Sequence, residues 1–229
     1  MRTVLLYRFF RGILFLLIFF GNIVSTAYAQ SEMQKTRIAI LYFENNAIQN
    51  SFTPLSKGLC DMMISDFNDS KCFIVVERTR LEDVIKELKL TESNNFDSTT
   101  TAKIGKLLGA EYLVLGSYFE FMGTFRIDAR LVKVETGKII ASAGFSGKVD
   151  EFEQIEKKVV AELQKKIVGI TRNNSVSKGI SLNTATQYGV ALNKIDSGDT
   201  KSAVTLLRDI VDASPDFALA KEMLQKVSK

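Results

Sequence analysis

The residue types that most often carry out catalysis or bind metal ions are scarce in this sequence. The chain of 229 residues contains no His, which removes the commonest general base and the commonest metal ligand. Its two cysteines, Cys60 and Cys72, have neither a His nor clustered acids to complete a zinc site. The segment GKLLGAE lacks the Gly-Lys-Ser/Thr ending of a phosphate-binding loop. The sequence therefore predicts a protein that is not an enzyme, with no catalytic residue, no metal ligand, no cofactor-binding residue and no cofactor.

A few polar or charged neighbours remain as candidate functional groups. Ser65-Asp66 and Glu82-Asp83 fall on predicted helices, and we expect both to be solvated helix faces. Glu77 and Arg78 lie at the end of a predicted strand and could act as a functional pair. Because ion pairs are frequent at the ends of such elements, we expect Arg78 to join a structural ion pair instead.

A less favoured hypothesis is an enzyme or a regulator that binds a small ligand. It would use carboxylates such as Asp128 together with Arg130 on the polar face of a predicted strand. This hypothesis predicts a concave pocket lined by Arg126, Asp128 and Arg130.

The N-terminal segment has the pattern of an export signal. Three Arg precede an apolar run from Ile13 to Phe20, and Ala27-Tyr28-Ala29 has the small residues that signal peptidase requires. We expect cleavage after Ala29. The alternative, an uncleaved membrane anchor, is disfavoured because Asn22 interrupts a run that should be about 20 residues long. No Cys lies near the junction, so a lipoprotein is not expected.

Removal of this segment would change the formal net charge from +4 to +1, because it holds three Arg and no acid. A near-neutral protein gives no electrostatic reason to expect a nucleic-acid partner. The export signal alone predicts a location outside the cytoplasm. An exported protein could oxidise Cys60 and Cys72, but their predicted positions on a helix and on the following strand favour two buried thiols.

The centre of the predicted fold is a run of three strands. Tyr112–Phe121 is mostly apolar and is expected to be covered on both faces. After a turn at Gly123, apolar and polar residues alternate from Arg126 to Val134. Glu135–Lys138 is a hairpin connection, and the same period continues from Ile139 to Val149. These segments predict an antiparallel meander.

The earlier segments predict buried strands that alternate with helices. Arg37–Phe43 and Cys72–Val76 are apolar runs typical of central or buried strands. Thr53 is the expected N-cap of a helix that ends at Asn68-Asp69-Ser70, and Thr79 that of the next helix.

Two further helices complete this domain. A short one begins at Asp97 or Ser98 and ends before Gly109, and Glu151–Ile170 is amphipathic. The predicted order is β-α-β-α-α-β-β-β-α. This is an α/β fold with a mixed sheet, its early strands parallel and its C-terminal meander antiparallel, flanked by helices.

Four sequence blocks occur in a fixed order: RIAILYFEN from Arg37, VVERTRLEDVIKEL from Val75, KIGKLLGAEYLVLGSY from Lys103 and RIDARLVKVETGKII from Arg126. Together they resemble the CsgG family of curli-secretion components. Related domains occur in the flagellar protein FlgO, in the amino-terminal domain of TolB and in lipoprotein activators of penicillin-binding proteins. The resemblance covers about Arg37 to Ile170. It implies a periplasmic, non-catalytic domain used in envelope assembly, and association with the outer membrane stays open.

The sequence departs from the curli channel at both of its membrane hairpins. Only Met122, Gly123 and Thr124 stand where the first hairpin would be inserted, and Val149 leads straight into the predicted helix from Glu151. A transmembrane strand needs about 9 to 11 residues. We therefore expect that this protein does not form a pore.

The C-terminal tail is predicted to be helical. Thr171–Asn183 is polar and is the expected linker, followed by helix-like segments at Ala185–Ile195 and Lys201–Val211. The positions of Ala191, Ala203 and Pro215 resemble a single tetratricopeptide repeat, and an ordinary helical hairpin is the alternative. One such unit cannot bury both its faces, so it must dock on the α/β domain, on another copy or on a partner.

These observations predict a signal peptide at 1–29, a CsgG-like α/β domain at 30–170, a linker at 171–183 and a tetratricopeptide-like helical tail at 184–229. The favoured function is a curli-like secretion or envelope-assembly role through protein–protein interaction. Partners would be envelope proteins or other copies of the chain, bound at the sheet edge and the helical tail, and an oligomer is compatible with this role. An activator or adaptor of a cell-wall synthase is the nearest alternative.

Overall fold

The structure is a computed structural model that describes residues 35–46, 50–70, 72–90, 97–168 and 179–228. The predicted signal peptide with its cleavage site, and residues 171–178 of the predicted linker, lie outside these ranges. The chain from Lys35 onward forms one compact unit. Among the described residues, no helix is both long and apolar enough to cross a membrane.

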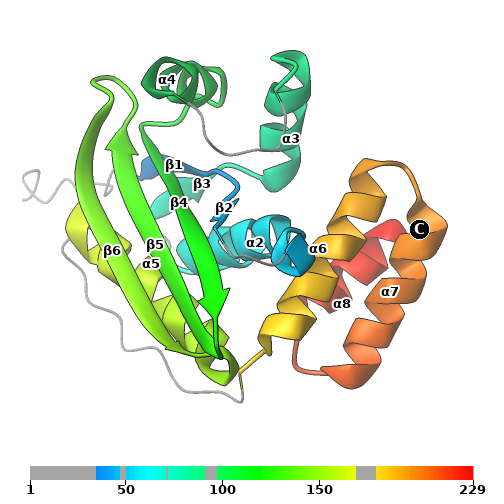
Figure 1. The fold of residues 1–229 in the computed structure, drawn as a ribbon. Helices are drawn as coiled ribbons and strands as arrows, with labels where there is room; N and C mark the ends of the chain where they lie inside the picture. The colour runs from blue at the N-terminus through cyan, green and yellow to red at the C-terminus, as the bar shows by residue number, and fades with distance from the viewer. Residues whose placement is uncertain (1–34, 47–49, 71, 91–96, 169–178, 229) are drawn as a thin grey trace, which may run out of the picture. The chain divides into compact units, whose positions relative to one another are not determined.

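A mixed sheet forms the centre of this unit, with strand order β3-β1-β4-β5-β6 and with β2 beside β4 (Figure 1). β1 lies between β3 and β4 and pairs with both in parallel, whereas β4, β5 and β6 form the antiparallel meander. The strands are β1 Thr36–Ile40, β2 Glu44–Asn45, β3 Phe73–Val75, β4 Tyr112–Phe121, β5 Thr124–Lys133 and β6 Lys138–Lys148. The predicted mixed α/β sheet is therefore confirmed.

Helices flank the sheet and form the C-terminal module. They are α2 Leu55–Asn68, α3 Arg78–Glu87, α4 Ser98–Leu107, α5 Phe152–Val168, α6 Leu182–Asp196, α7 Thr200–Ala213 and α8 Ala218–Val227, with short 3-10 turns at Asn50–Phe52 and Val149–Glu151. α6 begins at Leu182, so the last two residues of the predicted linker are helical.

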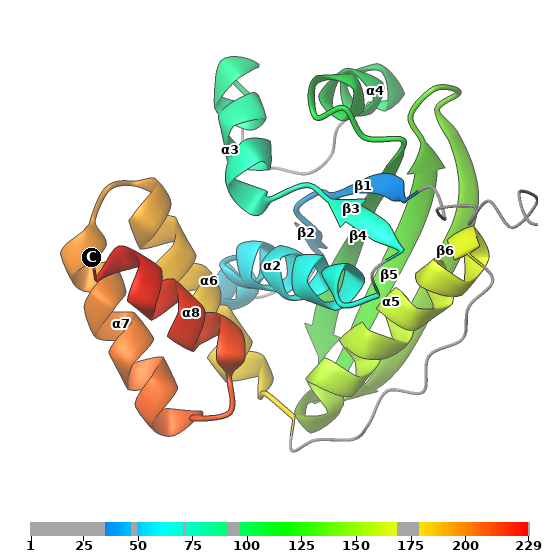
Figure 2. The ribbon, with the colours of Figure 1, turned by 180° about the vertical axis from the view of Figure 1, so that it is seen from behind.

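The two faces of the sheet are covered unequally. α2 and α5 lie across one face (Figure 2), where Phe125 of β5 stacks on Tyr118 of β4 and meets Phe152 of α5 edge-on, with ring centroids 6.1 and 5.2 Å apart. On the other face α4 covers only one end, where Gly105 packs directly on Val134 and Leu113. Figure 1 shows no helix in front of the remaining parts of β5 and β6.

This unequal cover corrects two sequence predictions. β4 is fully buried at Leu113, Val114 and Tyr118, but its other residues after Val114 are half-buried or exposed, and Phe121 is 53% exposed. β3 is an edge strand rather than a buried one, and Ile74 is 46% exposed. An apolar run indicates a strand, but it does not show which strands lie at the edge.

Several predicted element ends also differ from the structure. β1 ends at Ile40, although the next three residues are buried. The residue before α2 is Pro54 and the residue before α3 is Glu77, so neither Thr53 nor Thr79 is the N-cap. Two other predictions are confirmed. The Asp97 side chain accepts a hydrogen bond from the backbone N–H of Thr100 at the start of α4, and Gly109 follows that helix with a φ of +63°.

The helical tail docks on the α/β domain through a close contact between α2 and α6. Gly58 of α2 faces the carbonyl oxygen of Ala185, and a Cβ added at Gly58 would lie 2.5 Å from it. Gly189 of α6 faces the carbonyl oxygen of Pro54, and a Cβ there would lie 1.8 Å from it. The two glycines therefore allow the helix backbones to approach more closely than any larger residue would. The sequence left open whether the tail docks on the α/β domain, on another copy or on a partner. The structure shows docking on the α/β domain.

Candidate interaction surface

β6 is an edge strand of 11 residues, and none of the described residues pairs with its outer side. Its inner side pairs with β5 along the whole length of both strands, with a bulge at Ile140. The segment Ile139–Gly147 contains no proline and no charged residue, two of the features that commonly protect an edge strand from pairing. Ile139 and Ile140 are 57% and 46% exposed. The outer side of β6, called here the β6 edge, can therefore accept a further strand, most regularly between Ala141 and Lys148.

The uncovered face beside this edge carries the charged residues that the sequence singled out. Arg126 donates two hydrogen bonds to the Asp128 carboxylate, from Nε at 2.7 Å and from a terminal nitrogen at 2.6 Å. The hydrogen bonds to Asp128 raise the pKa of Arg126. Gly144 of β6 lets this pair lie over the strand, since a Cβ there would be 2.4 Å from an Asp128 oxygen. Arg130 is exposed on the same face.

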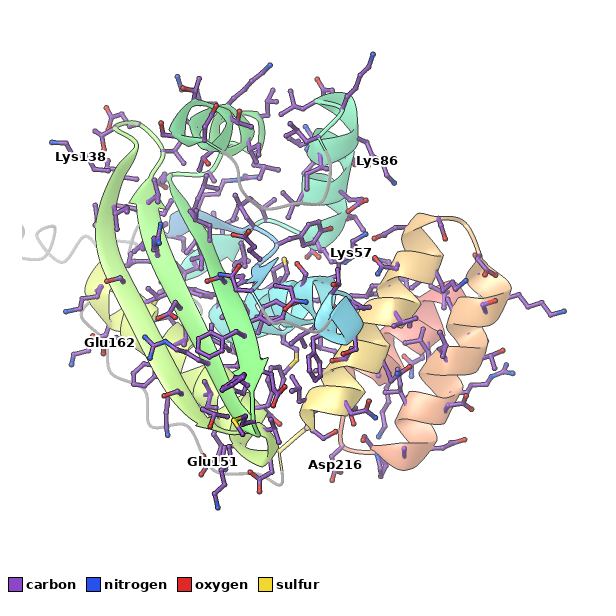
Figure 3. All side chains as sticks on the ribbon, in the orientation of Figure 1. Lys57, Lys86, Lys138, Glu151, Glu162 and Asp216 are labelled. Atoms are coloured by element: carbon purple, nitrogen blue, oxygen red, sulfur yellow. The ribbon has the colours of Figure 1, made fainter. Side chains whose placement is uncertain are left out.

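The predicted structural ion pair of Arg78 is present and connects the two parts of the chain. Arg78 donates two hydrogen bonds to Asp196 at the end of α6, at 2.7 and 3.1 Å. Lys57 of α2 donates a third to the same carboxylate, at 2.8 Å. Figure 3 places Lys57 at the junction of α2 and α6, and Lys138 projecting from the turn before β6.

Two more buried groups complete this arrangement, which is called here the Asp196 cluster. The Tyr42 hydroxyl donates to Glu82 at 2.5 Å, and Glu82 lies 3.6 Å from the Lys57 ammonium. The cluster therefore contains two cations and two carboxylates, each with an opposite partner. At its margin, Asp61 accepts a hydrogen bond from Tyr188 of α6 at 2.7 Å.

The pKa values in the cluster follow from these contacts. Burial alone would raise the pKa of Asp196, but the hydrogen bonds from Arg78 and Lys57 outweigh it and hold that pKa below its usual value. Burial raises the pKa of Tyr42, and the Glu82 hydrogen bond adds to the effect. Asp196 therefore stays ionised at neutral pH, as a structural counter-ion should.

The prediction that the two acidic neighbours are solvated is wrong at one residue in each. Glu82 is only 6% exposed, within the Asp196 cluster. Asp66 is half-buried between α2 and α5, and burial raises its pKa. Residues of other elements cover these two side chains: Tyr42 and Lys57 contact Glu82, and Glu156 of α5 lies near Asp66. The apolar spacing within one helix does not indicate such contacts. Cys60 and Cys72 are free and buried in the structure.

Sequence reasoning also missed Asp196 itself. Asp196 is the last residue of α6, and the helix dipole disfavours a negative charge at that end. This position was a signal in the sequence that Asp196 has a positively charged partner on another element. The identity of that partner depends on the docking of α6 on α2, which the sequence does not specify.

The family comparison supports the resemblance seen in the sequence. Residues 21–126 match the model of the family described as "Curli production assembly/transport component CsgG". The resemblance to the CsgG family is therefore confirmed over this stretch, which ends within β5. The rest of the meander, α5 and the helical tail lie beyond the match. A tetratricopeptide repeat in the tail stays a prediction.

Solved structures share a distant likeness with the chain. The C-terminal domain of LpoB from Escherichia coli is 17% identical with a TM-score of 0.40, and the match covers 56% of this chain and 93% of that one. TolB from Acinetobacter baumannii is 17% identical with a TM-score of 0.42, covering 61% and 30%. The PelC dodecamer from Paraburkholderia phytofirmans is 9% identical with a TM-score of 0.39, covering 61% and 90%. No curated protein matches the chain.

Proposed function

We propose that this protein is a non-catalytic assembly or adaptor protein of the cell envelope that acts by binding other proteins. It is exported to the periplasm and binds a partner strand at the β6 edge. The family match over residues 21–126 and the export-signal pattern support the envelope assignment. Because the matched family is described by curli production, secretion of that kind is the first role to test.

One observation carries the proposal: the β6 edge is long, carries no charge between its two terminal lysines and is unpaired among the described residues. Backbone groups along such an edge give affinity to an added strand, and neighbouring side chains give specificity. Lys138 and Lys148 stand at its two ends. In an antiparallel pair of two β6 strands in full register these lysines would face each other, and like charges directly opposite are destabilising. A partner strand with acidic residues at its ends fits better than a second copy.

The connections of the meander support an adaptor rather than a pore. β4 ends at Phe121 and β5 begins at Thr124, so only two residues join them. β6 is followed directly by a 3-10 turn and α5. A membrane-crossing hairpin inserted at either connection would need about 9 to 11 further residues in each of its strands, and neither connection has room for it.

Site-specific photocrosslinking in the cells that make the protein tests the proposal. A photoreactive residue at position 140, beside the β6 edge, should form a discrete adduct with an envelope protein. Position 74 on β3, at the other edge of the sheet, is the matched control because Ile74 and Ile140 are both 46% exposed. The mass of the adduct distinguishes a different protein from a second copy.

A variant with a charged residue at the β6 edge is the second part of this test. Ile140→Lys should abolish the function of the protein and, combined with a photoreactive residue at position 142, should abolish the adduct. Met122→Lys, at an exposed hairpin turn away from the edge, should leave both intact. Equal adducts from positions 74 and 140, or none from 140, would contradict the proposal.

A further inference from the structure

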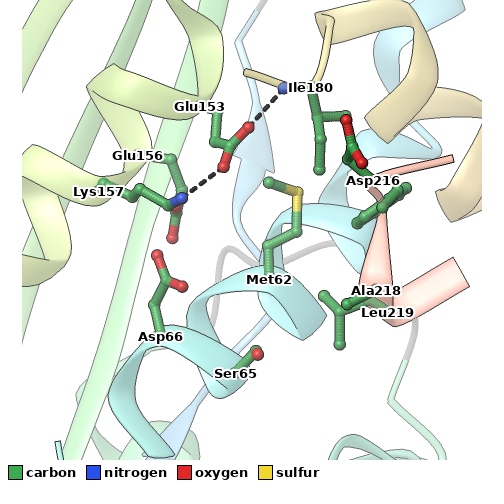
Figure 4. Close-up of a pocket in the computed structure, with 11 residues that line it drawn as sticks. Met62, Ser65, Asp66, Glu153, Glu156, Lys157, Ile180, Asp216, Ala218 and Leu219 are labelled. Atoms are coloured by element: carbon green, nitrogen blue, oxygen red, sulfur yellow. Dashed lines mark hydrogen bonds and ion pairs between the residues drawn. The ribbon is translucent and has the colours of Figure 1, made fainter. Parts of the chain in front are cut away.

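A pocket of about 210 Å³ lies between α2, α5 and the segments that lead into α6 and α8 (Figure 4). Four carboxyl groups line it: Asp66 from α2, Glu153 and Glu156 from α5, and Asp216 before α8. The one basic residue in the lining is Lys157. Within the lining, carboxyl groups therefore outnumber cations by four to one.

The single lysine of this pocket is bound to one of these acids. Lys157 forms an ion pair with Glu153, one turn earlier on α5. Glu153 also accepts a hydrogen bond from the backbone N–H of Ile180, which tethers the segment before α6. Figure 4 shows both contacts as dashed lines. Glu153 is thus a structural residue.

Glu156 has no comparable partner. Its side chain is 0% exposed, and within the described residues neither carboxyl oxygen has a hydrogen-bond donor. Figure 4 shows its carboxyl group directed toward that of Asp66. Two carboxyl groups can form one hydrogen bond only if they hold a proton between them. Burial raises the pKa of Glu156 well above its usual value, and the charge of Asp66 raises it further.

The walls of the pocket restrict the kind of ligand that fits it. Met62, Ile180 and Leu219 contribute apolar surface, which suits an alkyl chain. Among the described residues, no three Cys, Asp or Glu side chains are placed to hold a metal ion. A buried carboxyl group that lacks a donor, as Glu156 does among the described residues, is satisfied best by a charged donor with several N–H groups.

We propose that this pocket binds an alkylammonium group, whose cationic head lies between Glu156 and Asp66 and whose chain lies along Met62 and Leu219. The group is either a lysine side chain of a partner protein or a free amine. The pocket is separate from the β6 edge. The proposal for the pocket does not depend on the function proposed for the β6 edge. Asp216 and Ala218 on its rim are exposed, so the pocket borders solvent.

Binding of this cation is linked to protons. The charges that face Glu156 are Asp66 from α2, Glu153 and Lys157 from α5, and Asp216 before α8. The raised pKa of Glu156 favours its protonated form in the free protein, whereas an ammonium group favours the carboxylate. Each binding event therefore releases up to one proton, and affinity rises by up to about tenfold per pH unit below the pKa of Glu156.

Titration of the purified protein with n-butylammonium chloride tests the site, by calorimetry in buffers of different ionisation enthalpy and by NMR. We expect saturable binding, release of a proton, shifts confined to α2, α5 and the segments that lead into α6 and α8, and no response to n-butanol. Glu156→Gln should weaken binding by at least about tenfold, since it keeps the shape and removes the charge. Glu162→Gln, on the same helix but outside the lining, is the matched control and should bind as the unmodified protein does.

A second titration identifies the source of the amine. If Nα-acetyl-lysine methylamide binds at least as tightly as butylammonium, the pocket takes a lysine of a partner protein. If only free amines bind, the ligand is a small molecule. Absence of saturable butylammonium binding, or equal binding by the Glu156→Gln variant, would overturn the proposal. The melting temperature of each variant shows whether it is folded.

Discussion

Two groups of buried charge lie along α2, and they differ in how completely they are paired. The Asp196 cluster holds two cations and two carboxylates, joined by short contacts across α2, α3 and α6. The Glu156 pocket holds four carboxyl groups and one lysine, and both oxygens of Glu156 lack a donor among the described residues. To remove one partner from a paired group is costly, because a buried charge is left uncompensated, whereas an unpaired group costs stability while it is present.

Removal of Asp196 should give the largest effect, because it breaks the paired group. Asp196→Ala leaves Arg78 and Lys57 buried without their common counter-ion, and removal of one partner of a buried pair costs about 3 kcal/mol. Chemical denaturation measures this loss. Asp209→Ala, an exposed acid on α7, should change the free energy of unfolding by less than about 0.5 kcal/mol. Equal effects of the two variants would show that the cluster does not hold the tail in place.

Separation of α2 from α6 should have the next largest effect. Gly189→Ala places a Cβ where the Pro54 carbonyl oxygen lies, and overpacking of this kind costs about 1–3 kcal/mol. Because the Asp196 cluster spans the same contact, hydrogen exchange should accelerate in α6 more than in β5. Gln187→Ala, exposed on the same helix, should leave exchange unchanged. Unchanged exchange in the Gly189→Ala variant would argue against close docking.

The two groups should also respond to pH in opposite directions. The pKa of Asp196 is lowered in the folded protein, so its contribution is complete above its unfolded pKa of about 3.9 and is lost as the pH falls through its folded value. The pKa of Glu156 is raised, so stability falls as the pH rises from about 4.3 through its folded value.

Two conservative variants separate these contributions. Glu156→Gln should differ little from the unmodified protein near pH 5 and become the more stable of the two as the pH rises. Asp196→Asn should be less stable at neutral pH, with a deficit that shrinks in acid. Urea denaturation at several pH values measures both curves, and parallel curves for the two variants would contradict the comparison.

The sequence predicted the elements better than the contacts between them. Alternating and apolar runs located the meander, and Arg78 was correctly assigned to a structural ion pair. The partner of Arg78 lies on α6, and neither the docking of α6 nor the role of Gly58 and Gly189 leaves a local pattern. Solvation of Glu82 was predicted wrongly for the same reason.

Glu156 could have been found from the sequence. It stands four residues after Phe152 and three before Val159, within the apolar stripe of a helix whose other stripe residues are buried. A carboxyl group at such a position needs a partner or a proton. The pocket itself depends on the segments before α6 and α8, and the apolar period does not position them.

The pKa of the Glu156 carboxyl group is the most direct test of the difference between the two groups of charge. It is measured by following the side-chain carboxyl carbon by NMR as the pH is changed, with the Glu156→Gln spectrum to assign the signal. The account predicts that Glu156 remains protonated at neutral pH, with a pKa well above the ordinary value of about 4.3. A pKa near that ordinary value would contradict the account. It would show that the Glu156 carboxylate is paired or solvated, and that the two groups of charge do not differ in pairing.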